Sequence, residues 1–311
     1  MSAEAAAVLS QYIAADPASL RLLEQARKLA ETSSTLLIQG ESGAGKDLLA
    51  LVIHYLGRNP DAPFVNIDCA SLPHELMESE LFGYEKGAFT GATHLKRGRM
   101  ELAGDGTLVL NEIAALTTPM QAKLLRVIED RKLDRLGGSR PIPVSARLIS
   151  ITNVDLEQAV KRKGFREDLY YRLSVVPLVV PSLRERRGDI LPLAEHFLKQ
   201  LAEIHRRPAK SLAAKAADAL EKHDFPGNVR ELRNILERAL IHSSAARIEL
   251  ADLPSHLQQV DRRSRQTLEE LERAYIAQIL DDTRGKKSKA ADILGISRKT
   301  LLEKRKRYKL D

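Results

Sequence analysis

The chain has 311 residues, of which 43% are apolar and 29% charged, a composition typical of a soluble globular protein large enough for more than one core. Its longest apolar runs, such as 175–180, are far too short to cross a bilayer, and the N-terminus lacks the basic start of a secretory signal. We therefore expect a cytoplasmic protein with no membrane partner. Cys69 is the single cysteine, which excludes an internal disulfide, and no Cys and His cluster has zinc-ligand spacing.

The net charge of +7 is concentrated at the C-terminus. Residues 284–311 hold eleven Lys or Arg and three acids, which leaves residues 1–283 with 38 bases and 39 acids. A positive block of this kind favours a polyanion, above all nucleic acid, because neutralised phosphates release counterions. A solvated basic tail is the alternative.

Apolar residues predict alternating helices and strands over the first 180 residues. Helical spacing at 19–30 leads into a short buried strand at 35–38, a glycine-rich loop and a second helix at 48–56. Three more strands are predicted, with helical stretches such as 120–128 between them, at 64–67, 107–110 and 147–151. This alternation indicates an α/β fold with a mainly parallel sheet.

Beyond residue 181 the strand signal disappears. Helices are predicted at 190–204, 211–222 and 229–243, an arrangement typical of a helical lid. A polar segment at 258–267 contains three arginines and few apolar residues, which favours a linker, and helical periodicity returns after it.

Residues 40–46 match the first seven positions of the P-loop pattern, in which backbone N–H groups wrap a phosphate and a lysine neutralises its charge. The preceding strand and following helix place that phosphate at a positive helix N-terminus. A chance glycine-rich turn is the alternative, and the flanking elements disfavour it. The predicted nucleotide site comprises Gly40, Glu41, Ser42, Gly43, Ala44, Gly45, Lys46 and Asp47, where the general pattern has Ser or Thr instead of Asp47 to contact magnesium.

The strand at 107–110 ends in Asn111 and Glu112, where an ATPase of this kind holds magnesium and polarises water. Glu112 is the candidate for activating that water, and Asn111 is a weak candidate ligand for Mg. A strand end that merely exposes polar residues is the alternative. The P-loop upstream makes the functional interpretation stronger.

Four segments together resemble the AAA+ domain of sigma-54-dependent transcriptional activators. They are the P-loop, residues 165–173, residues 225–232 and the hexapeptide Gly87, Ala88, Phe89, Thr90, Gly91 and Ala92. The resemblance extends from about residue 10 to residue 310. It implies an ATP-dependent activator that binds upstream DNA and remodels the closed complex of sigma-54 RNA polymerase holoenzyme, with the hexapeptide on a mobile loop that touches sigma-54.

The resemblance also implies roles for individual residues. With ATP and magnesium as cofactors, Lys46 binds phosphates and Glu112 supports hydrolysis. Asn153 is similar to the family's sensor of the γ-phosphate, and Arg230 is similar to its lid sensor and belongs to the nucleotide-binding set.

Arg166 and Arg172 match arginines that reach the nucleotide of a neighbouring subunit, which implies a homo-oligomeric ring, usually a hexamer. An arginine supplied across an interface stabilises charge on the transferring phosphoryl group and makes turnover depend on assembly. Surface ion pairs with Glu167 and Asp168 are the alternative for these two arginines.

Two positions depart from the family, which normally has Asp at position 111 and Asn at position 68. Asn111 lacks the charge that favours a hard divalent cation, so we expect weaker magnesium binding. Asp68 aligns with the asparagine that holds the catalytic glutamate. We hypothesise an exchange in which one carboxylate moves between neighbouring strands, and a degenerate, slow site is the alternative.

The basic C-terminus carries two apolar sets at helical spacing, so it is not merely a charged tail. The first set, expected on one helix face, comprises Leu268, Leu271, Tyr275, Ile279 and Leu280. The second set comprises Ala290, Ala291, Ile293, Leu294 and Ile296. Both sets need an apolar partner, which disfavours a solvated basic helix.

Between and after these sets, Gly295 supplies a turn and Ser297 caps the next helix. The layout resembles the Fis-type domain, whose second helix enters the major groove of double-stranded DNA. Family members commonly have a leucine and a glycine at the two positions that hold Arg305 and Lys309 here, which affect helix packing and the C-terminal cap. The expected DNA contacts are Ser297, Arg298, Lys299, Thr300 and Lys304.

The predicted domains are an AAA+ α/β nucleotide-binding subdomain at 1–180, a helical lid at 181–257, a linker at 258–267 and a Fis-type domain at 268–311. The P-loop begins at Gly40, which leaves no room for a preceding regulatory domain, so we expect control by a separate regulatory protein or by expression level. Two rivals remain. One is a DNA-bound regulator that binds nucleotide with weak or no hydrolysis; the other is a helicase loader or unfoldase, which leaves the hexapeptide unexplained.

Overall fold

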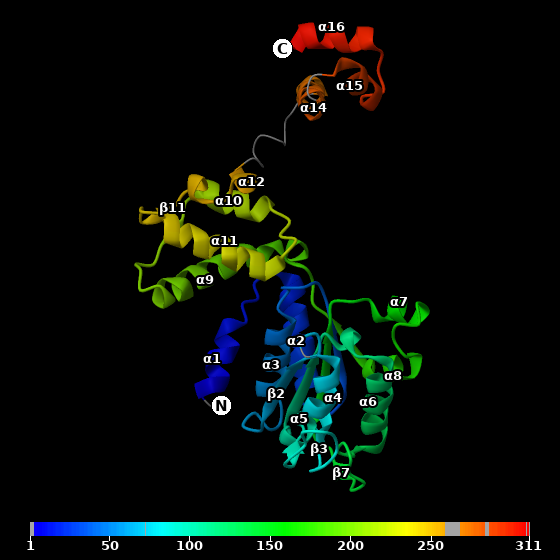
Figure 1. Ribbon diagram of the computed structural model, residues 1–311. Helices are drawn as coiled ribbons and strands as arrows, with labels where there is room; N and C mark the ends of the chain where they lie inside the picture. Colours follow the sequence, from blue (N-terminus) through cyan, green and yellow to red (C-terminus); the bar gives the residue numbers. More distant parts are fainter. Residues whose placement is uncertain (1–2, 72, 259–267, 284–285, 309, 311) are drawn as a thin grey trace. The chain divides into compact units, whose positions relative to one another are not determined.

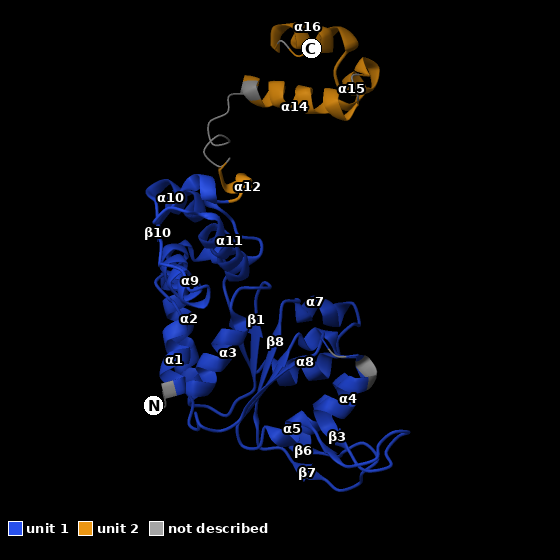
Figure 2. Cartoon of the chain, turned by 60° about the vertical axis from the view of Figure 1, so that its left-hand side comes forward, with its two compact units in different colours: residues 1–253 blue, residues 254–311 orange. Residues whose placement is uncertain are grey.

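The computed structural model describes residues 3–71, 73–258, 268–283, 286–308 and 310 (Figure 1). The chain forms two compact units, residues 1–253 and 254–311, which Figure 2 shows in different colours. Within the described residues no helix is long and apolar enough to cross a membrane. Apart from Gln258, the predicted linker lies outside the described residues.

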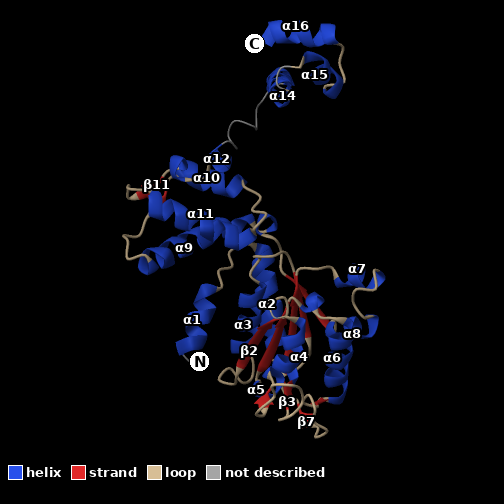
Figure 3. Cartoon of the chain, viewed as in Figure 1, coloured by secondary structure: helices blue, strands red, loops and turns tan. Residues whose placement is uncertain are grey.

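A five-stranded parallel sheet forms the centre of the first unit (Figure 3). Its strand order is β2-β5-β8-β1-β9. The strands are β1 (Leu36–Gln39), β2 (Phe64–Asp68), β5 (Thr107–Asn111), β8 (Arg147–Thr152) and β9 (Val176–Val179). The predicted α/β fold with a parallel sheet is confirmed, and the four predicted strands agree with the structure to within one residue.

The fifth strand, β9, is absent from the sequence-based prediction. Its segment contains Pro177, which has no N–H to donate and argues against a central strand. The structure resolves the conflict by placing β9 at the sheet edge, where it pairs only with β1. Val179 is accordingly 64% exposed.

Helices cover both faces of the sheet. One face carries α2 (Pro17–Ala30) and α3 (Lys46–Tyr55), with α1 (Ala3–Gln11) against α3. The other face carries α4 (His74–Phe82), α5 (Arg99–Leu102), α6 (Thr118–Asp130), α7 (Leu156–Lys161) and α8 (Glu167–Leu173).

Strand β1 shows why two cores form. Successive side chains of a strand point to opposite faces. Leu36 and Ile38 accordingly belong to the core beneath α2 and α3, whereas Leu37 belongs to the core beneath α4 and α6. All three side chains are fully buried, and burying one such side chain contributes roughly 1.5–3 kcal/mol.

A hairpin is inserted between β2 and β5. It is the antiparallel pair β3 (Gly83–Tyr84) and β4 (Lys96–Arg97), flanked along the chain by α4 and α5. Arg135 forms ion pairs with residues next to this hairpin: its Nη1 lies 2.7 Å from Glu85 Oε1, and its Nη2 lies 2.8 Å from Glu101 Oε2. A second antiparallel pair, β6 (Lys132–Leu133) and β7 (Ile142–Pro143), follows α6.

The lid of the first unit is mainly helical. It contains the short 3₁₀ helices η2 (Leu183–Glu185), η3 (Arg187–Asp189) and η4 (Leu250–Asp252), and the helices α9 (Ile190–Ile204), α10 (Ala214–Lys222) and α11 (Asn228–His242). The expectation of no strand beyond residue 181 is wrong, because β10 (Ser211–Leu212) pairs in parallel with β11 (Arg247–Ile248). Each of these strands is only two residues long, too short to show an apolar periodicity, so only the pairing between β10 and β11 identifies them as strands.

In its described residues, the second unit contains α12 (Ser255–Gln258), α14 (Leu268–Asp282), α15 (Lys287–Ile293) and α16 (Arg298–Tyr308). Its core contains Ile276, Ile279, Ala290, Ala291, Leu301 and Tyr308. The predicted interior face is wrong at Leu271, Tyr275 and Ile293, which are about half exposed. Apolar residues of α14 occupy more than one face, and the packing of α15 and α16 selects the face that holds Ile276.

Candidate functional site

Four parallel strands end at one edge of the sheet, and the polar residues that follow them gather there. The P-loop follows β1, Glu112 follows β5, Asn153 follows β8, and Asp68 is the last residue of β2. Asn111 Nδ2 donates to Asp47 Oδ1 at 2.7 Å, which joins the end of β5 to the first turn of α3. The structure thus brings the predicted nucleotide and hydrolysis residues to a common edge.

The P-loop runs from β1 into α3, whose helical residues begin at Lys46. Gly43 has a φ of +75°, and a Cβ on it would lie 2.5 Å from the carbonyl oxygen of Gly227, so this position excludes a side chain. Lys46 is 4% exposed, and its Nζ donates to the carbonyls of Gly40 and Glu41 at 2.9 Å.

Burial lowers the pKa of Lys46, while the nearby charges of Glu112 and Asp47 oppose that shift. The ammonium therefore lies in one electrostatic cluster with two carboxylates that the sequence separates by 65 residues. The unpaired N–H groups at the start of α3 add partial positive charge beside it. A phosphate group fits this arrangement of donors and positive charge.

The lid holds the P-loop through the first turn of α11. Asn228, fully buried, donates from Nδ2 to Glu41 Oε2 at 3.0 Å and to the Ser42 carbonyl at 3.1 Å. The backbone N–H of Val229 donates to the Gly43 carbonyl at 3.0 Å, and Arg230 Nη1 to Ser42 Oγ at 3.1 Å. Arg230 thus lies at the P-loop, as expected. Asn228 also contacts the P-loop, although it is not among the predicted nucleotide-binding residues. It belongs to segment 225–232, which resembles the family.

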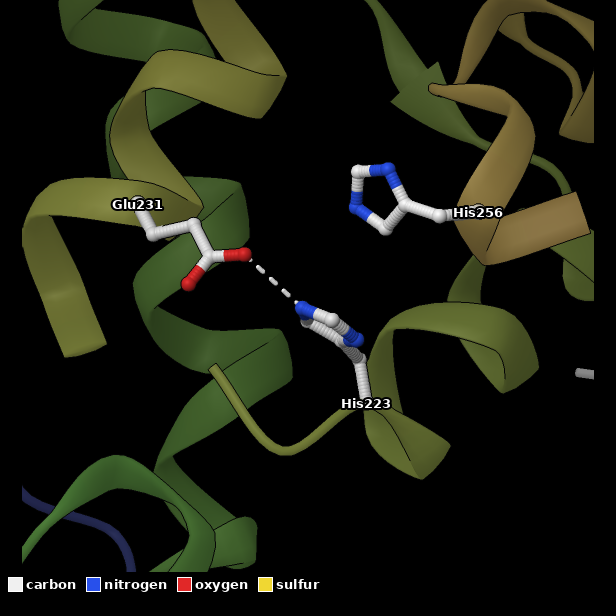
Figure 4. A group of neighbouring side chains, drawn as sticks. All are labelled: His223, Glu231 and His256. Carbon is white, nitrogen blue, oxygen red and sulfur yellow. Dashed lines mark hydrogen bonds and ion pairs between the residues drawn. The ribbon is translucent and has the colours of Figure 1, made fainter. Parts of the chain in front are cut away.

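A histidine and a glutamate support that turn from within the lid. His223 Nε2 and Glu231 Oε1 lie 2.8 Å apart (Figure 4). The other carboxylate oxygen of Glu231 accepts the N–H of Gly227 at 2.8 Å. Glu231 therefore links the end of α10 to the start of α11. This link positions the residues that touch the P-loop.

A cavity of about 220 Å³ adjoins the P-loop, and the predicted set misses most of its lining. Arg186, which is buried, and Tyr12, which is half-buried, line it. Each has one buried polar atom, Tyr12 Oη and Arg186 Nε, with no hydrogen-bond partner among the described residues. Burial raises the pKa of Tyr12 and lowers that of Arg186, the latter opposed by Asp189. No local sequence signal could reveal this cavity, since its walls come from the N-terminal segment, the P-loop and the lid.

The two atypical residues have different partners. Asp68 and Asn111 are direct partners in the register of β2 and β5, yet Asp68 Oδ1 accepts the N–H of Ala70 at 2.9 Å. Asn111 uses its amide nitrogen for Asp47 and its oxygen for the N–H of Glu112 at 2.9 Å. Glu112 has a φ of +51°, a conformation that costs roughly 1–3 kcal/mol outside glycine.

Cys69 follows this strand end and is buried. Burial, with Asp68 and Glu112 nearby, raises the pKa of its thiol to about 12. A thiol that stays protonated at neutral pH is a poor nucleophile and metal ligand.

Asn153, Arg166 at the N-cap of α8 and Arg172 within α8 are more exposed. Asn153 follows β8 at the same edge as the P-loop. Arg166 Nη2 pairs with Asp168 Oδ2 at 2.7 Å, and Arg172 Nε pairs with Glu129 Oε1 at 3.4 Å. The alternative of ion pairs with α8 carboxylates therefore holds for Arg166, whereas the partner of Arg172 comes from α6 because α8 packs against that helix.

The hexapeptide 87–92 lies between the two strands of the inserted hairpin. Its ends are closed by a hydrogen bond from the Gly87 N–H to the Ala92 carbonyl at 2.8 Å, and glycines with positive φ stand at positions 87 and 91. Phe89 is 48% exposed, with its ring 5.0 Å from that of Tyr84. An apolar ring is thus presented on a loop outside both cores.

In the second unit, Gly295 with a φ of +65° makes the turn between α15 and α16. Ser297 Oγ accepts the N–H of Thr300 at 3.1 Å, as a helix N-cap does. Arg298 and Lys299 are exposed in the first turn of α16. Lys304 is instead engaged by Glu272 Oε1 of α14 at 2.5 Å. Of the two departures noted above, Arg305 donates from Nε to the Leu310 carbonyl at 3.1 Å, and Lys309 lies outside the described residues.

The P-loop, the parallel sheet and the helical lid define the class, an ATPase domain of the AAA+ type. A family model described as the Sigma-54 interaction domain matches residues 12–179. The AAA+ ATPase lid domain matches residues 184–270, and the Fis family of bacterial regulatory proteins matches residues 267–308. The chain belongs to the family of sigma-54-dependent transcriptional regulators.

Individual proteins similar to this chain support the family assignment. The regulatory protein AtoC of Escherichia coli K12 is 41% identical over 308 residues, which cover 95% of this chain and 67% of AtoC. The regulator FlbD of Caulobacter vibrioides is 42% identical over 314 residues, with 94% and 69% covered. NtrX from Brucella abortus, crystallised in one case in complex with ATP, matches with a TM-score of 0.74 and 34% identity over 95% of this chain and 69% of NtrX.

Proposed function

We propose that this regulator hydrolyses ATP and couples turnover to remodelling of sigma-54 RNA polymerase holoenzyme through the hexapeptide 87–92. The supporting observation is where the hairpin enters the fold, between β2 and β5. The last residues of these strands, Asp68 and Asn111, are register partners at the nucleotide edge. A nucleotide-dependent shift at the end of β2 can therefore reach the hairpin through α4, the helix that joins Asp68 to Gly83 along the chain.

Phe89→Ala tests the coupling, because Phe89 presents exposed apolar surface on the hexapeptide. We expect ATPase activity within about twofold of the parent, since the ring touches no nucleotide-edge residue, but loss of holoenzyme binding with ADP and aluminium fluoride. Leu20→Ala, which removes a similarly exposed side chain from α2, serves as the matched control. A Phe89→Ala protein that still opens sigma-54 promoters would refute the proposed role.

The oxygens of Asp47, Asn111 and Glu112 suit a magnesium ion, since hard cations prefer oxygen ligands. Asp47 and Asn111 already lie within hydrogen-bond distance of each other. When bound, the ion would neutralise charge on the phosphates. The carboxylate of Asp47 stands at the P-loop position that ordinarily contacts magnesium, so it supplies the charge that Asn111 lacks.

Either Asp47 or Asp68 could supply the negative charge that Asn111 lacks. Measuring how strongly ADP affinity depends on magnesium in variants of each residue distinguishes the two. We expect Asp47→Asn to lose most of that dependence and Asp68→Asn to keep it, because Asp68 bonds to Ala70. The reverse result favours the strand-to-strand exchange. A large ATPase gain in Asn111→Asp would sink both forms of compensation.

Arg166 and Arg172 are proposed to act on the nucleotide of a neighbouring subunit in a hexameric ring. Their side chains are 39% and 56% exposed. Exposed ion pairs are weak because solvent screens them, so both arginines can change partners. Specific ATPase activity should then rise with protein concentration. Arg172→Ala should abolish turnover while ATP affinity is retained.

The second candidate is a DNA-bound regulator that binds nucleotide with little or no hydrolysis. The presence of Asn111 at the end of β5 favours this candidate, because an amide binds a divalent cation more weakly than a carboxylate. A steady-state ATPase that stays at background at every protein concentration, with normal ADP binding, would select this candidate. The DNA contacts are proposed to be Arg298, Lys299 and Thr300 in either case.

A further inference from the structure

A cavity of about 490 Å³ lies at the opposite edge of the sheet, where the strands begin. Its walls are the segments that follow α2, α3 and α6 and the segments that lead into β5 and β8. None of the residues assigned above to nucleotide, sigma-54 or DNA lines it. Cavities of this volume are the usual size for small-molecule ligands.

The lining of this cavity is cationic. Arg58, Arg131 and Arg147 line it against one carboxylate, Asp105, which accepts a hydrogen bond from Asn59 Nδ2 at 3.3 Å. Among the ion pairs of the described residues, none involves any of the three arginines. The cavity therefore has an excess of positive charge, because Asp105 alone does not balance three arginines.

Arg147 is the part of the lining that the fold holds most firmly. Its Nη1 and Nη2 donate to the carbonyls of Ala30 and Leu29 at 3.1 and 2.7 Å, at the end of α2. Burial lowers its pKa with no acidic group to oppose the shift, and its Nε has no hydrogen-bond partner among the described residues. The buried Arg186 differs, because Asp189 lies 3.7 Å away. Desolvated charge without a counter-ion is costly, and an anionic ligand would offset that cost.

Neutral donors complete the lining. His54 Nδ1 lies 2.9 Å from Thr107 Oγ1, and burial lowers the His54 pKa, so the ring adds hydrogen bonding but no charge at neutral pH. Hydroxyl groups of Thr32, Ser33 and Ser145 also line the cavity. Guanidinium groups present forked donors that match phosphate oxygens. We propose that this cavity binds a small anion that carries a phosphate group, held by Arg58, Arg131 and Arg147.

Inorganic pyrophosphate is a suitable probe, measured by isothermal titration calorimetry on the full chain with Lys46→Ala to disable the P-loop. We expect saturable binding of one pyrophosphate per chain. Adding Arg58→Ala and Arg131→Ala should weaken it at least about tenfold, since each removes a charged hydrogen-bond donor. Both arginines are exposed, so the fold should survive, and circular dichroism melting checks this.

Arg126→Ala is the matched control, because Arg126 is an exposed arginine of α6 that does not line this cavity. Unchanged pyrophosphate affinity in the control and loss in the double variant support the site. Three results would overturn it: no saturable binding with Lys46→Ala alone, equal affinity with and without Arg58 and Arg131, or an equal loss in the control. The first of these would mean that the P-loop is the anion site.

Discussion

The nucleotide edge and the C-terminal helices use charge in opposite ways. At the nucleotide edge, Lys46 is 4% exposed and Asn228 fully buried, and Asn228 reaches across 187 residues of sequence to Glu41. In the second unit, Arg298 and Lys299 are exposed on one eleven-residue helix. Buried polar groups need hydrogen-bond partners to offset their desolvation. Side chains that contact DNA phosphates stay hydrated until the DNA binds. Substitutions in the two regions should therefore differ in kind as well as size.

The largest effect, on the ATPase rate, is expected at the nucleotide edge. Glu112→Gln should lower the ATPase rate by about 10²–10⁴-fold while ATP affinity changes little, because an amide cannot accept the proton of the attacking water. Steady-state ATPase assays and nucleotide titration measure the two quantities. Glu24→Gln, on the surface of α2, serves as the control. An activity above a tenth of the parent would remove Glu112 from the mechanism.

Asn228→Ala should lower the stability of the first unit. The change removes three hydrogen bonds, leaves the buried N–H of Leu183 unpaired and forces alanine to a φ of +52°. We expect a loss of roughly 2–4 kcal/mol in the free energy of unfolding, measured with urea. Asn59→Ala, at an exposed position, should cost far less. Equal effects would mean that the lid contact with the P-loop adds no stability.

A smaller effect is expected at the exposed helix. Arg298→Ala should weaken DNA binding about tenfold and reduce the salt dependence by about one counterion, if the side chain meets phosphate or a base edge. Fluorescence anisotropy at several salt concentrations measures both. Arg273→Ala, an exposed arginine of α14, should leave DNA affinity unchanged, and ATPase activity should persist in both variants. The same loss in both would point to net charge alone.

The smallest effect concerns the cap of α16. Ser297→Ala should cost about 1 kcal/mol of stability in the second unit, because it removes the acceptor for the Thr300 N–H. Thermal unfolding measures the loss. Ser288→Ala, at the second residue of α15, should cost far less, since alanine is a strong helix former. A cost at position 288 that matches the one at 297 would argue against a specific cap.

Local patterns were sufficient for most elements of the fold. Apolar periodicity located four sheet strands and the helices α9 and α11, because one buried face repeats over several residues. The P-loop was recognisable because phosphate binding needs glycines and a lysine in a set order between a strand and a helix. Residues 87–92 were recognisable as a motif, but their place between β3 and β4 was not.

Pairings and neighbours distant in sequence had to come from the folded chain. The edge strand β9 depends on β1, 140 residues earlier in the register pair Leu36 and Val176, and β10 depends on β11. Tyr12 and Arg186 meet at one cavity because the lid packs against the P-loop. Helix α14 buries Ile276 rather than Tyr275 because α15 and α16 pack there. Sequence neighbours carry no information about such contacts, since each is decided by which surfaces the whole chain can bury together.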